Sequence, residues 1–220
     1  MPAITSAFDP DCRRCPRLAG FLDAVRQLHP DYVCKPVPPF GDPDARLIIV
    51  GLAPGMHGAN RTGRPFTGDH AGILLYQTLN ALGMASSARS VDAHDPMTLR
   101  DVRISNAVKC LPPANKPLPA EIKSCNGFLR HELAHSPGAR VVLALGGIAH
   151  QAVLHASDLP SGRHRFAHAA EYELSGGRVL IDSYHCSRYN TQTRRLTAAM
   201  FEAVVRRAAE LAFAGAGRPS

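Results

Sequence analysis

The chain has 220 residues, 45% of them hydrophobic, and a formal net charge of +7. This length and composition indicate one globular domain over residues 1–220 and exclude a disordered chain. No run of eighteen apolar residues occurs, so no membrane-spanning helix is expected. The first residues, MPAITSAFDPDCRRC, lack the apolar core of a signal peptide, which indicates a cytoplasmic protein. The positive charge favours a polyanion such as nucleic acid as partner, although a merely solvated cationic surface would give the same total.

Apolar runs alternate with helical patterns along the chain. In chain order the sequence predicts a helix over 15–29, a strand over 45–52, a helix over 71–83, a strand over 102–109, a helix over 119–133, a strand over 139–146, a helix over 147–156, a strand over 178–184 and a long helix over 191–214. Thr191 and Thr193 are the expected caps of the last helix. A short extra strand is expected within 166–174. The alternation predicts an α/β fold with three α/β/α layers and a central, mostly parallel four-stranded sheet.

Four of the six cysteines form two pairs that are far apart in the sequence. Cys12 and Cys15 make a C-x-x-C, and Cys110 and Cys125 flank the rigid run LPPANKPLP. A disulfide framework is not expected in a cytoplasmic chain of this size. Together the pairs can supply four thiolates, which suits tetrahedral zinc or a cubane iron–sulfur cluster, although the spacing is irregular for a zinc ribbon. The alternative is buried structural cysteines plus a redox pair.

Three polar motifs follow predicted strands. GLAPGMHGANRTGRPFTGD follows the first strand, NAVKC ends the second, and HCSRYNTQTRRLT follows the last. GLAPG is neither a P-loop nor a G-x-G-x-x-G, and alone it would indicate a tight turn. In open α/β sheets, ligands bind outside the carboxyl ends of the strands, so the three motifs predict a site at one rim of the sheet.

The residue types of the first motif suit a ligand that has a flat base and a sugar. Gly51, Ala53 and Gly55 leave an open backbone against which such a ligand can lie. Phe66 can stack on the base while Asp69 faces the sugar. For Phe66 the alternative is a loop anchor that packs into the core.

Taken together, these motifs resemble those of the type B, or family five, uracil-DNA glycosylases, which are iron–sulfur members of the uracil-DNA glycosylase superfamily. The resemblance extends from the C-x-x-C to the final helix. In the sister iron–sulfur family the first motif reads GEAPG, and Leu52 at the glutamate position fits type B. The resemblance implies a monofunctional DNA glycosylase that flips uracil out of DNA and hydrolyses its N-glycosidic bond in base excision repair. It also implies hypoxanthine, xanthine and ethenocytosine as further substrates.

The same resemblance implies a cofactor and its ligands. It identifies Cys12, Cys15, Cys110 and Cys125 as the ligands of a structural [4Fe–4S] cluster, which would tie the N-terminal segment to the loop after NAVKC. Because Cys110 lies four residues after Asn106, the cluster would also brace the strand end that presents Asn106.

Three residues are the expected catalytic groups. Asp69 would stabilise positive charge on the sugar and orient or deprotonate the attacking water. His185 would donate to uracil O2, and the amide of Asn106 would pair with O4 and N3–H of the base. For His185 the alternative is a histidine satisfied by a backbone carbonyl, and for Asn106 a side chain that caps the following loop.

The expected DNA contacts lie in two segments. The segment Ser187, Arg188, Tyr189 and Asn190 is expected to enter the minor groove, with Arg188 or Tyr189 as the wedge. Arg61 and Arg64 are expected to contact phosphates, and the alternative for each is a solvated surface arginine. In the base site, Gly51, Ala53 and Gly55 would pack against the base, and Asn60 would order their loop.

Other classes of function fit the sequence less well. A non-catalytic iron–sulfur protein that binds damaged DNA would need no carboxylate facing the sugar. A relative that traps DNA covalently would need a basic insert near the first motif, which NRTGRPFTGD lacks. A zinc-bound RNA-binding or nucleotide-hydrolysing protein finds no nucleotide signature here. A monomer acting on DNA with uracil or other deaminated bases is expected.

Overall fold

A mixed sheet forms the centre of the fold in the computed structural model, which describes residues 7–214. Within that range the sheet has six strands: β1 (Phe40–Gly41), β2 (Leu47–Gly51), β3 (Val102–Asn106), β4 (Val141–Leu145), β5 (Glu171–Glu173) and β6 (Val179–Ser183). Their order is β1-β3-β2-β4-β6-β5. The four inner strands are parallel, whereas β1 and β5 pair antiparallel at the two edges. The mostly parallel α/β sheet is confirmed, but the expected number of four strands was wrong because two short edge strands extend it. One of them, β5, lies within the extra strand expected over 166–174, and the other, β1, was not expected.

The inner strands are buried on both faces, as their unbroken apolar runs predict. Side chains alternate across a strand, so Leu47 and Ile49 of β2 join one core cluster while Ile48 and Val50 join the other. Each cluster needs a layer of helices to exclude water from it.

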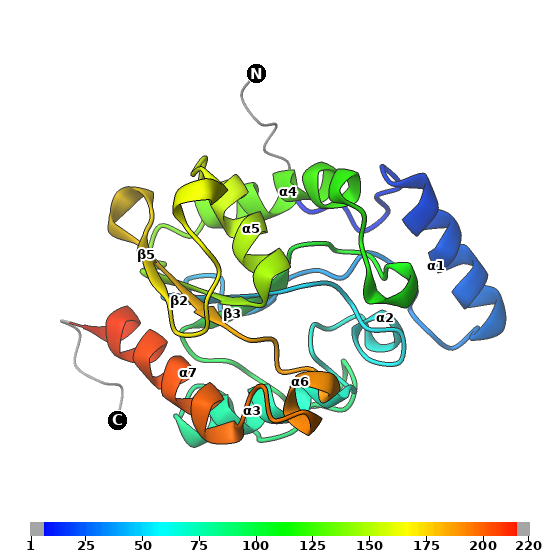
Figure 1. The fold of residues 1–220 in the computed structure, drawn as a ribbon. Helices are drawn as coiled ribbons and strands as arrows, with labels where there is room; N and C mark the ends of the chain where they lie inside the picture. The colour runs from blue at the N-terminus through cyan, green and yellow to red at the C-terminus, as the bar shows by residue number, and fades with distance from the viewer. Residues whose placement is uncertain (1–6, 215–220) are drawn as a thin grey trace.

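Seven α-helices occur in the described range: α1 (Pro16–Leu28), α2 (Ala59–Thr62), α3 (His70–Ala81), α4 (Pro119–Ala134), α5 (Gly147–Ala156), α6 (Arg188–Gln192) and α7 (Ala198–Phe213). Figure 1 shows α4 and α5 on one face of the sheet and α3 and α7 on the other. The three-layer architecture is therefore confirmed. No helix in residues 7–214 is long and apolar enough to cross a membrane.

The long C-terminal helix predicted over 191–214 is two helices. Arg194 adopts a left-handed backbone with φ of 57°, which ends the helical path after α6. Thr197 then caps α7, because its hydroxyl accepts a hydrogen bond of 3.2 Å from the backbone N–H three residues further on. The expected caps Thr191 and Thr193 lie within α6 and at its end, so that prediction was wrong.

α1 stands apart from the two helical layers, at one side of the molecule (Figure 1). It starts with Pro16 at its first position and buries Leu18, Leu22 and Val25. The guanidinium of Arg17 pairs with the carboxylate of Glu121 on α4 at 2.6 Å, which joins α1 to the rest of the fold. Residues 1–6, part of the segment behind the cytoplasmic prediction, lie outside the described residues.

Candidate active site

A cavity of about 400 Å³ opens at the carboxyl ends of β2, β3 and β6. This volume is in the range of small-molecule sites. The cavity brings together eight of the residues predicted from the sequence: Ala53, Gly55, Phe66, Asp69, Asn106, His185, Ser187 and Arg188. Residues from all three motifs therefore meet at one rim of the sheet.

Asp69 is the N-cap of α3 and also lines the cavity. Its Oδ1 accepts a hydrogen bond of 2.9 Å from the backbone N–H of Gly72. Its Oδ2 lies beside Gly55 and Gly58, since a Cβ built on Gly58 would be only 2.5 Å from that oxygen. Burial raises the pKa of Asp69 above its usual range, although the backbone N–H groups of Gly72 and Ala71 oppose the shift. One oxygen is thus held by the helix while the other lies against Gly55 and Gly58.

Asn106 and Phe66 meet over Gly51. A Cβ on Gly51 would lie 2.5 Å from Asn106 Oδ1 and 2.6 Å from Phe66 Cζ, so only glycine permits this approach. Gly51 itself lies behind the cavity wall rather than on it. Asn106 is 3% exposed, and its amide makes no hydrogen bond to any of residues 7–214. The structure therefore does not support the alternative of a loop-capping amide.

Phe66 serves both expected purposes. It belongs to the main hydrophobic cluster and at the same time lines the cavity. Its ring is stacked at 26° on the ring of His185, with the centroids 6.0 Å apart. Its backbone is left-handed, with φ of 54°, which is uncommon for an aromatic residue and is held here by the surrounding loop. The loop anchor and the aromatic wall of the cavity are the same residue.

His185 is a neutral imidazole in the cavity wall. Burial lowers its pKa to about 4, so the ring is uncharged at neutral pH. No carbonyl in the described chain accepts a hydrogen bond from this ring, which argues against a histidine that is already satisfied. Its ring N–H is left as a hydrogen-bond donor for a ligand.

The segment after His185 forms a short capped helix. The Ser187 hydroxyl accepts a hydrogen bond from the Asn190 backbone N–H, and the Asn190 amide donates to the His185 carbonyl at 2.8 Å. These two polar side chains hold the segment in place. Tyr189 is 70% exposed, and Arg188 lies at the mouth of the cavity. The projecting residues are therefore the two that were expected to act as a wedge.

Three predicted residues lie away from the cavity. Asn60 is buried, and its Nδ2 donates to Cys34 Sγ at 3.4 Å, so it orders the loop as expected without touching the cavity. Arg61 lies in a neighbouring groove. The prediction that Arg64 contacts a phosphate was wrong, because Arg64 is buried and its guanidinium pairs with the carboxylate of Asp95.

Four lining residues carry no functional signal in their motifs: Ala59, His70, Ala71 and Asn115. Asn115 comes from the proline-rich run between two of the cysteines and adopts a left-handed backbone with φ of 56°. Asparagine tolerates this conformation, so the asparagine in the run PANK is a sequence signal for a turn that can be recognised in retrospect. His70 packs against the last motif, with its Nε2 3.1 Å from Thr191 Oγ1.

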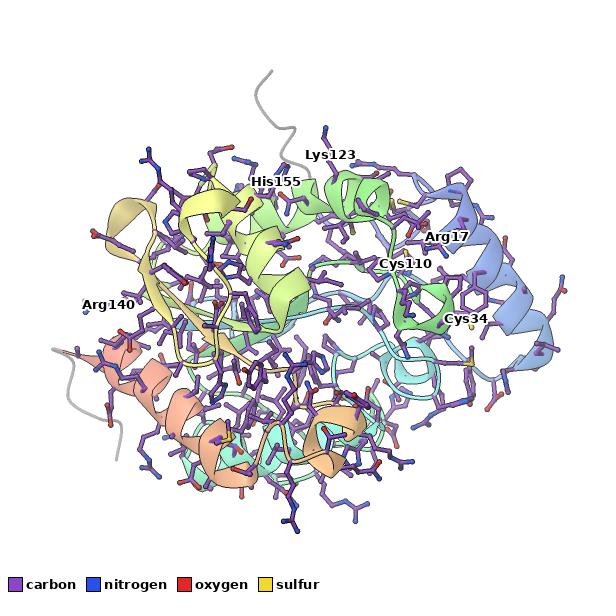
Figure 2. All side chains as sticks on the ribbon, viewed as in Figure 1. Arg17, Cys34, Cys110, Lys123, Arg140 and His155 are labelled. Carbon is purple, nitrogen blue, oxygen red and sulfur yellow. The ribbon has the colours of Figure 1, made fainter. Side chains whose placement is uncertain are left out.

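A second cavity gathers the four predicted metal-ligand cysteines, Cys12, Cys15, Cys110 and Cys125, between α1, α4 and the segment after β3. Figure 2 labels Cys110 close to α1. Burial first, and then the neighbouring thiols, raise the pKa of Cys110 to about 12. The backbone N–H of Lys109 donates to Cys125 Sγ at 3.3 Å. Thiols this buried lose their protons only when a cation replaces them.

The donor set, four cysteine thiols around one cavity, is of a kind that can hold a metal group. No three His, Cys, Asp or Glu side chains in residues 7–214 are placed to hold a single metal ion. Tetrahedral zinc would need thiolates about 3.8 Å apart, from Zn–S bonds of about 2.3 Å. A cubane cluster would likewise take four cysteine thiolates as its ligands. An N–H···S bond, as at Cys125, is also typical of such clusters.

Comparison with known proteins identifies the family. A profile of the Uracil DNA glycosylase superfamily matches residues 38–209. The chain belongs to this superfamily. The type-5 uracil-DNA glycosylase of Thermus thermophilus is 47% identical over 206 residues, covering 91% of this chain and 94% of the relative. That of Mycobacterium bovis is 43% identical over 211 residues, covering 91% and 78%, and that of Pyrobaculum aerophilum 42% over 203 residues, covering 90% and 88%.

These identities place the chain with the type-5 uracil-DNA glycosylases and confirm the resemblance seen in the motifs. A type-4 uracil-DNA glycosylase of Thermotoga maritima is more distant, at 31% identity over 148 residues. The superfamily match at 38–209 contains every residue that lines the larger cavity. Cys12 and Cys15 lie before the matched region.

Proposed function

We propose that this member of the uracil-DNA glycosylase superfamily is a monofunctional glycosylase that hydrolyses the N-glycosidic bond of uracil in DNA, in base excision repair. One observation carries the proposal: a buried carboxylate, an unpaired amide and a neutral imidazole, from Asp69, Asn106 and His185, line the same cavity. The names of the type-5 relatives support the reaction. The geometry of each group gives it a role.

Asp69 acts on the sugar side. Cleavage of the glycosidic bond builds positive charge on the sugar and negative charge on the departing base. With Oδ1 held by Gly72, Oδ2 can face the sugar or the attacking water. The raised pKa of Asp69 makes it a stronger base toward that water than an ordinary aspartate.

His185 and Asn106 act on the base. The neutral His185 ring donates to uracil O2, where negative charge develops as the bond breaks. The Asn106 amide donates to O4 and accepts from N3–H, which cytosine cannot offer. Phe66 stacks on the ring of the base. Because Gly51 allows Asn106 and Phe66 to lie close together, Asn106 can bind the edge of the base while Phe66 stacks on its face.

The substrate nucleotide must leave the duplex to reach this cavity. Flipping costs a few kcal/mol, and less at a mismatched pair such as U·G. Arg188 lines the cavity and the next residue, Tyr189, is exposed, which supports the proposal that one of these side chains fills the gap in the stack. We therefore propose DNA as the partner of the protein and the cytoplasm as the protein's location. We further propose a monomer with one domain, and the single sheet running through the described chain supports the single domain.

Larger deaminated bases are compatible with the same cavity. Its volume of about 400 Å³ leaves room for a two-ring base, and Leu52 gives it an apolar wall where a charged side chain would select more narrowly. Hypoxanthine, xanthine and ethenocytosine are therefore proposed as further substrates.

We infer that the cysteine cavity holds a [4Fe–4S] cluster, with Cys12, Cys15, Cys110 and Cys125 as ligands. When bound, the group supplies a structural cross-link rather than a reacting atom. The chain's own residues support this, since two ligands precede α1, one follows β3 and one lies on α4. The cross-link would fix α1 and the segment that follows Asn106.

The test is base release from duplexes that contain U·G, U·A or hypoxanthine·T. Free base in the supernatant and alkali-labile breaks in the strand, without breaks before alkali, are the expected result. A folded, cluster-loaded protein that binds these duplexes but releases no base would overturn the proposal. It would leave a non-catalytic protein that binds damaged DNA.

A further inference from the structure

A groove of about 310 Å³ adjoins the base cavity. Its lining comes from the first motif, from the start of α3, from the connection between α3 and β3, and from α6. It shares Asp69, His70 and Arg188 with the base cavity, so the two lie side by side. A strand that continues from a sugar bound at Asp69 would therefore pass along this groove.

The groove is strongly positive. Arg61, Arg89 and Arg188 line it, and the only carboxylate among the lining residues is Asp69. The side chains of Arg89 and Arg188 form no hydrogen bond or ion pair with other described residues. Two guanidinium groups are thus available to an anion, and Arg61 adds a third positive charge.

The neighbouring carboxylates are engaged elsewhere. Asp92 accepts a hydrogen bond of 2.7 Å from the backbone N–H of His94. Asp95 pairs with the buried guanidinium of Arg64 and also accepts from the backbone N–H of Val91 at 2.7 Å. Neither side chain lines the groove, so they leave its arginines uncompensated.

The walls of the groove are held in place before any ligand arrives. Arg61 donates to the carbonyls of His57 at 2.9 Å and Val91 at 3.0 Å. Gly68 is left-handed, with φ of +79°, and a Cβ there would lie 2.4 Å from Arg61 Nη2. Arg64 anchors the connection that carries Arg89 through Ser90, at 3.1 Å. Arg64 therefore acts as a brace for the groove.

We propose that this groove binds the phosphates of the DNA strand next to the flipped nucleotide, and that Arg89 is one of the contacts. The inference rests on the proposed function for the identity of the nucleotide beside it. Guanidinium groups pair with phosphate oxygens through charge-assisted hydrogen bonds, and such contacts fix register on the strand without reading its sequence. The arrangement assigns the connection between α3 and β3, which carries no motif, to DNA binding.

Arg89 is the clean position for a test. Arg61 also supports its own loop, and Arg188 also lines the base cavity, whereas the Arg89 side chain makes no hydrogen bond or ion pair within residues 7–214 that its loss would disturb. The full chain would be compared as wild type, Arg89→Gln and Arg89→Lys. The matched control is Arg140→Gln, because Arg140 is an exposed arginine that precedes β4 at the opposite end of the sheet. Figure 2 labels it well away from α2 and α6.

Binding of an undamaged duplex would be measured by fluorescence anisotropy across a salt series, beside the kinetics of uracil release. Loss of one phosphate contact should lower the slope of log affinity against log salt by about 0.9 and weaken binding about 5–10-fold at 100 mM salt. We expect this for Arg89→Gln, with a rise in KM for uracil release, while Arg89→Lys retains most of the affinity. Arg140→Gln should match wild type.

Two outcomes separate the inference from the proposed function. The inference that the groove binds phosphates would be overturned if wild type is active and Arg89→Gln has the same KM and the same slope of log affinity against log salt. An equal change of slope and KM in Arg140→Gln would also overturn it, since the loss of any surface charge would then be enough to weaken DNA binding. Wild type that binds DNA but releases no uracil would overturn the proposed function alone.

Discussion

Asp69 divides its work between its two carboxylate oxygens. The oxygen that caps α3 makes the helix hold the carboxylate in place, so little side-chain entropy remains to be lost when substrate binds. The other oxygen lies among Gly55 and Gly58, where any side chain would collide with it. Helix capping alone does not require glycines beside the second oxygen, so these glycines indicate a further role for Asp69.

Lys109 forms an ion pair whose two side chains are both buried. Its Nζ is 2.7 Å from Glu132 Oε1 and donates to Ser105 Oγ, and that hydroxyl donates to Glu132 Oε2 at 2.6 Å. Ser105 directly precedes Asn106, so the pair supports the strand end that faces the base. We expect Lys109→Met to lower the free energy of unfolding by about 3–5 kcal/mol, because Glu132 would stay buried without a partner.

Urea denaturation would measure this effect, with Lys123→Met as the control. Lys123 lies on α4, as Glu132 does, but points to solvent, as Figure 2 shows. The double variant Lys109→Met/Glu132→Leu should regain most of the loss, because it removes both charges. A single variant as stable as the control would contradict the account.

At the scale of elements, the four cysteines line one cavity between α1 and α4, where the proposed cluster would join the two helices. We expect protein purified without oxygen to carry about four iron atoms per chain and a visible charge-transfer absorbance. Cys110→Ser should lose both iron and colour. Cys34→Ser should keep them, because Cys34 is buried against Asn60 outside the cysteine cavity. Colourless wild type that contains zinc would refute the cluster.

His150 on α5 and Asp182 on β6 join two other elements. Burial opposes protonation of His150, but the hydrogen bond of 2.9 Å to Asp182, the charge of Asp182 and the His164 carbonyl outweigh it and raise the pKa of His150. A raised pKa in the folded state stabilises the fold fully below the unfolded pKa of about 6.5, and this contribution disappears as pH rises through the folded pKa.

The free energy of unfolding should therefore fall as the pH rises above about 6.5. We expect His150→Gln to remove that part of the pH dependence, as measured by urea denaturation at a series of pH values. His155→Gln on the exposed side of the same helix should leave the wild-type profile unchanged. A His150→Gln profile parallel to that of wild type would contradict this role.

The inner strands and five helical regions could be predicted because each carries a long apolar pattern. The edge strand β1 could not, since its two residues have no periodicity of their own, whereas β5 lies within the extra strand expected over 166–174. The break between α6 and α7 escaped prediction because Arg194 has no intrinsic preference for a left-handed backbone. The short helix α2 lies inside a motif that otherwise indicates a loop.

In the site, motif residues at strand ends were placed correctly on one rim because parallel strands end together. Arg64 was misplaced, since its partner Asp95 lies in a connection without pattern and their contact exists only in the folded chain. His70 and Asn115 reach the cavity for the same reason. Distant pairings of this kind depend on tertiary packing, which sequence periodicity does not contain.

At the scale of the molecule, one end of the sheet carries the DNA-related features. The base cavity and the arginine groove share that rim, and the cysteine cavity lies beside them next to α1. The sheet acts as a rigid platform, while the residues proposed to contact DNA come from the segments that follow its strands. The net charge of +7 suits such a surface.

A monomer is the expected assembly. Sedimentation equilibrium should give the mass of one chain, 23.6 kDa, across a wide range of protein concentrations. A mass that rises toward twice this value within that range would contradict the prediction.

The most direct test of the account is the single-turnover rate of uracil release by Asp69→Asn. Asparagine caps a helix as well as aspartate does, so α3 should keep its start and the variant its stability and affinity for undamaged DNA. The account predicts that the rate falls by about 10²–10⁴-fold, because the charge beside the sugar and the base toward water are both lost. A folded Asp69→Asn variant that released uracil within a few-fold of the wild-type rate would contradict it.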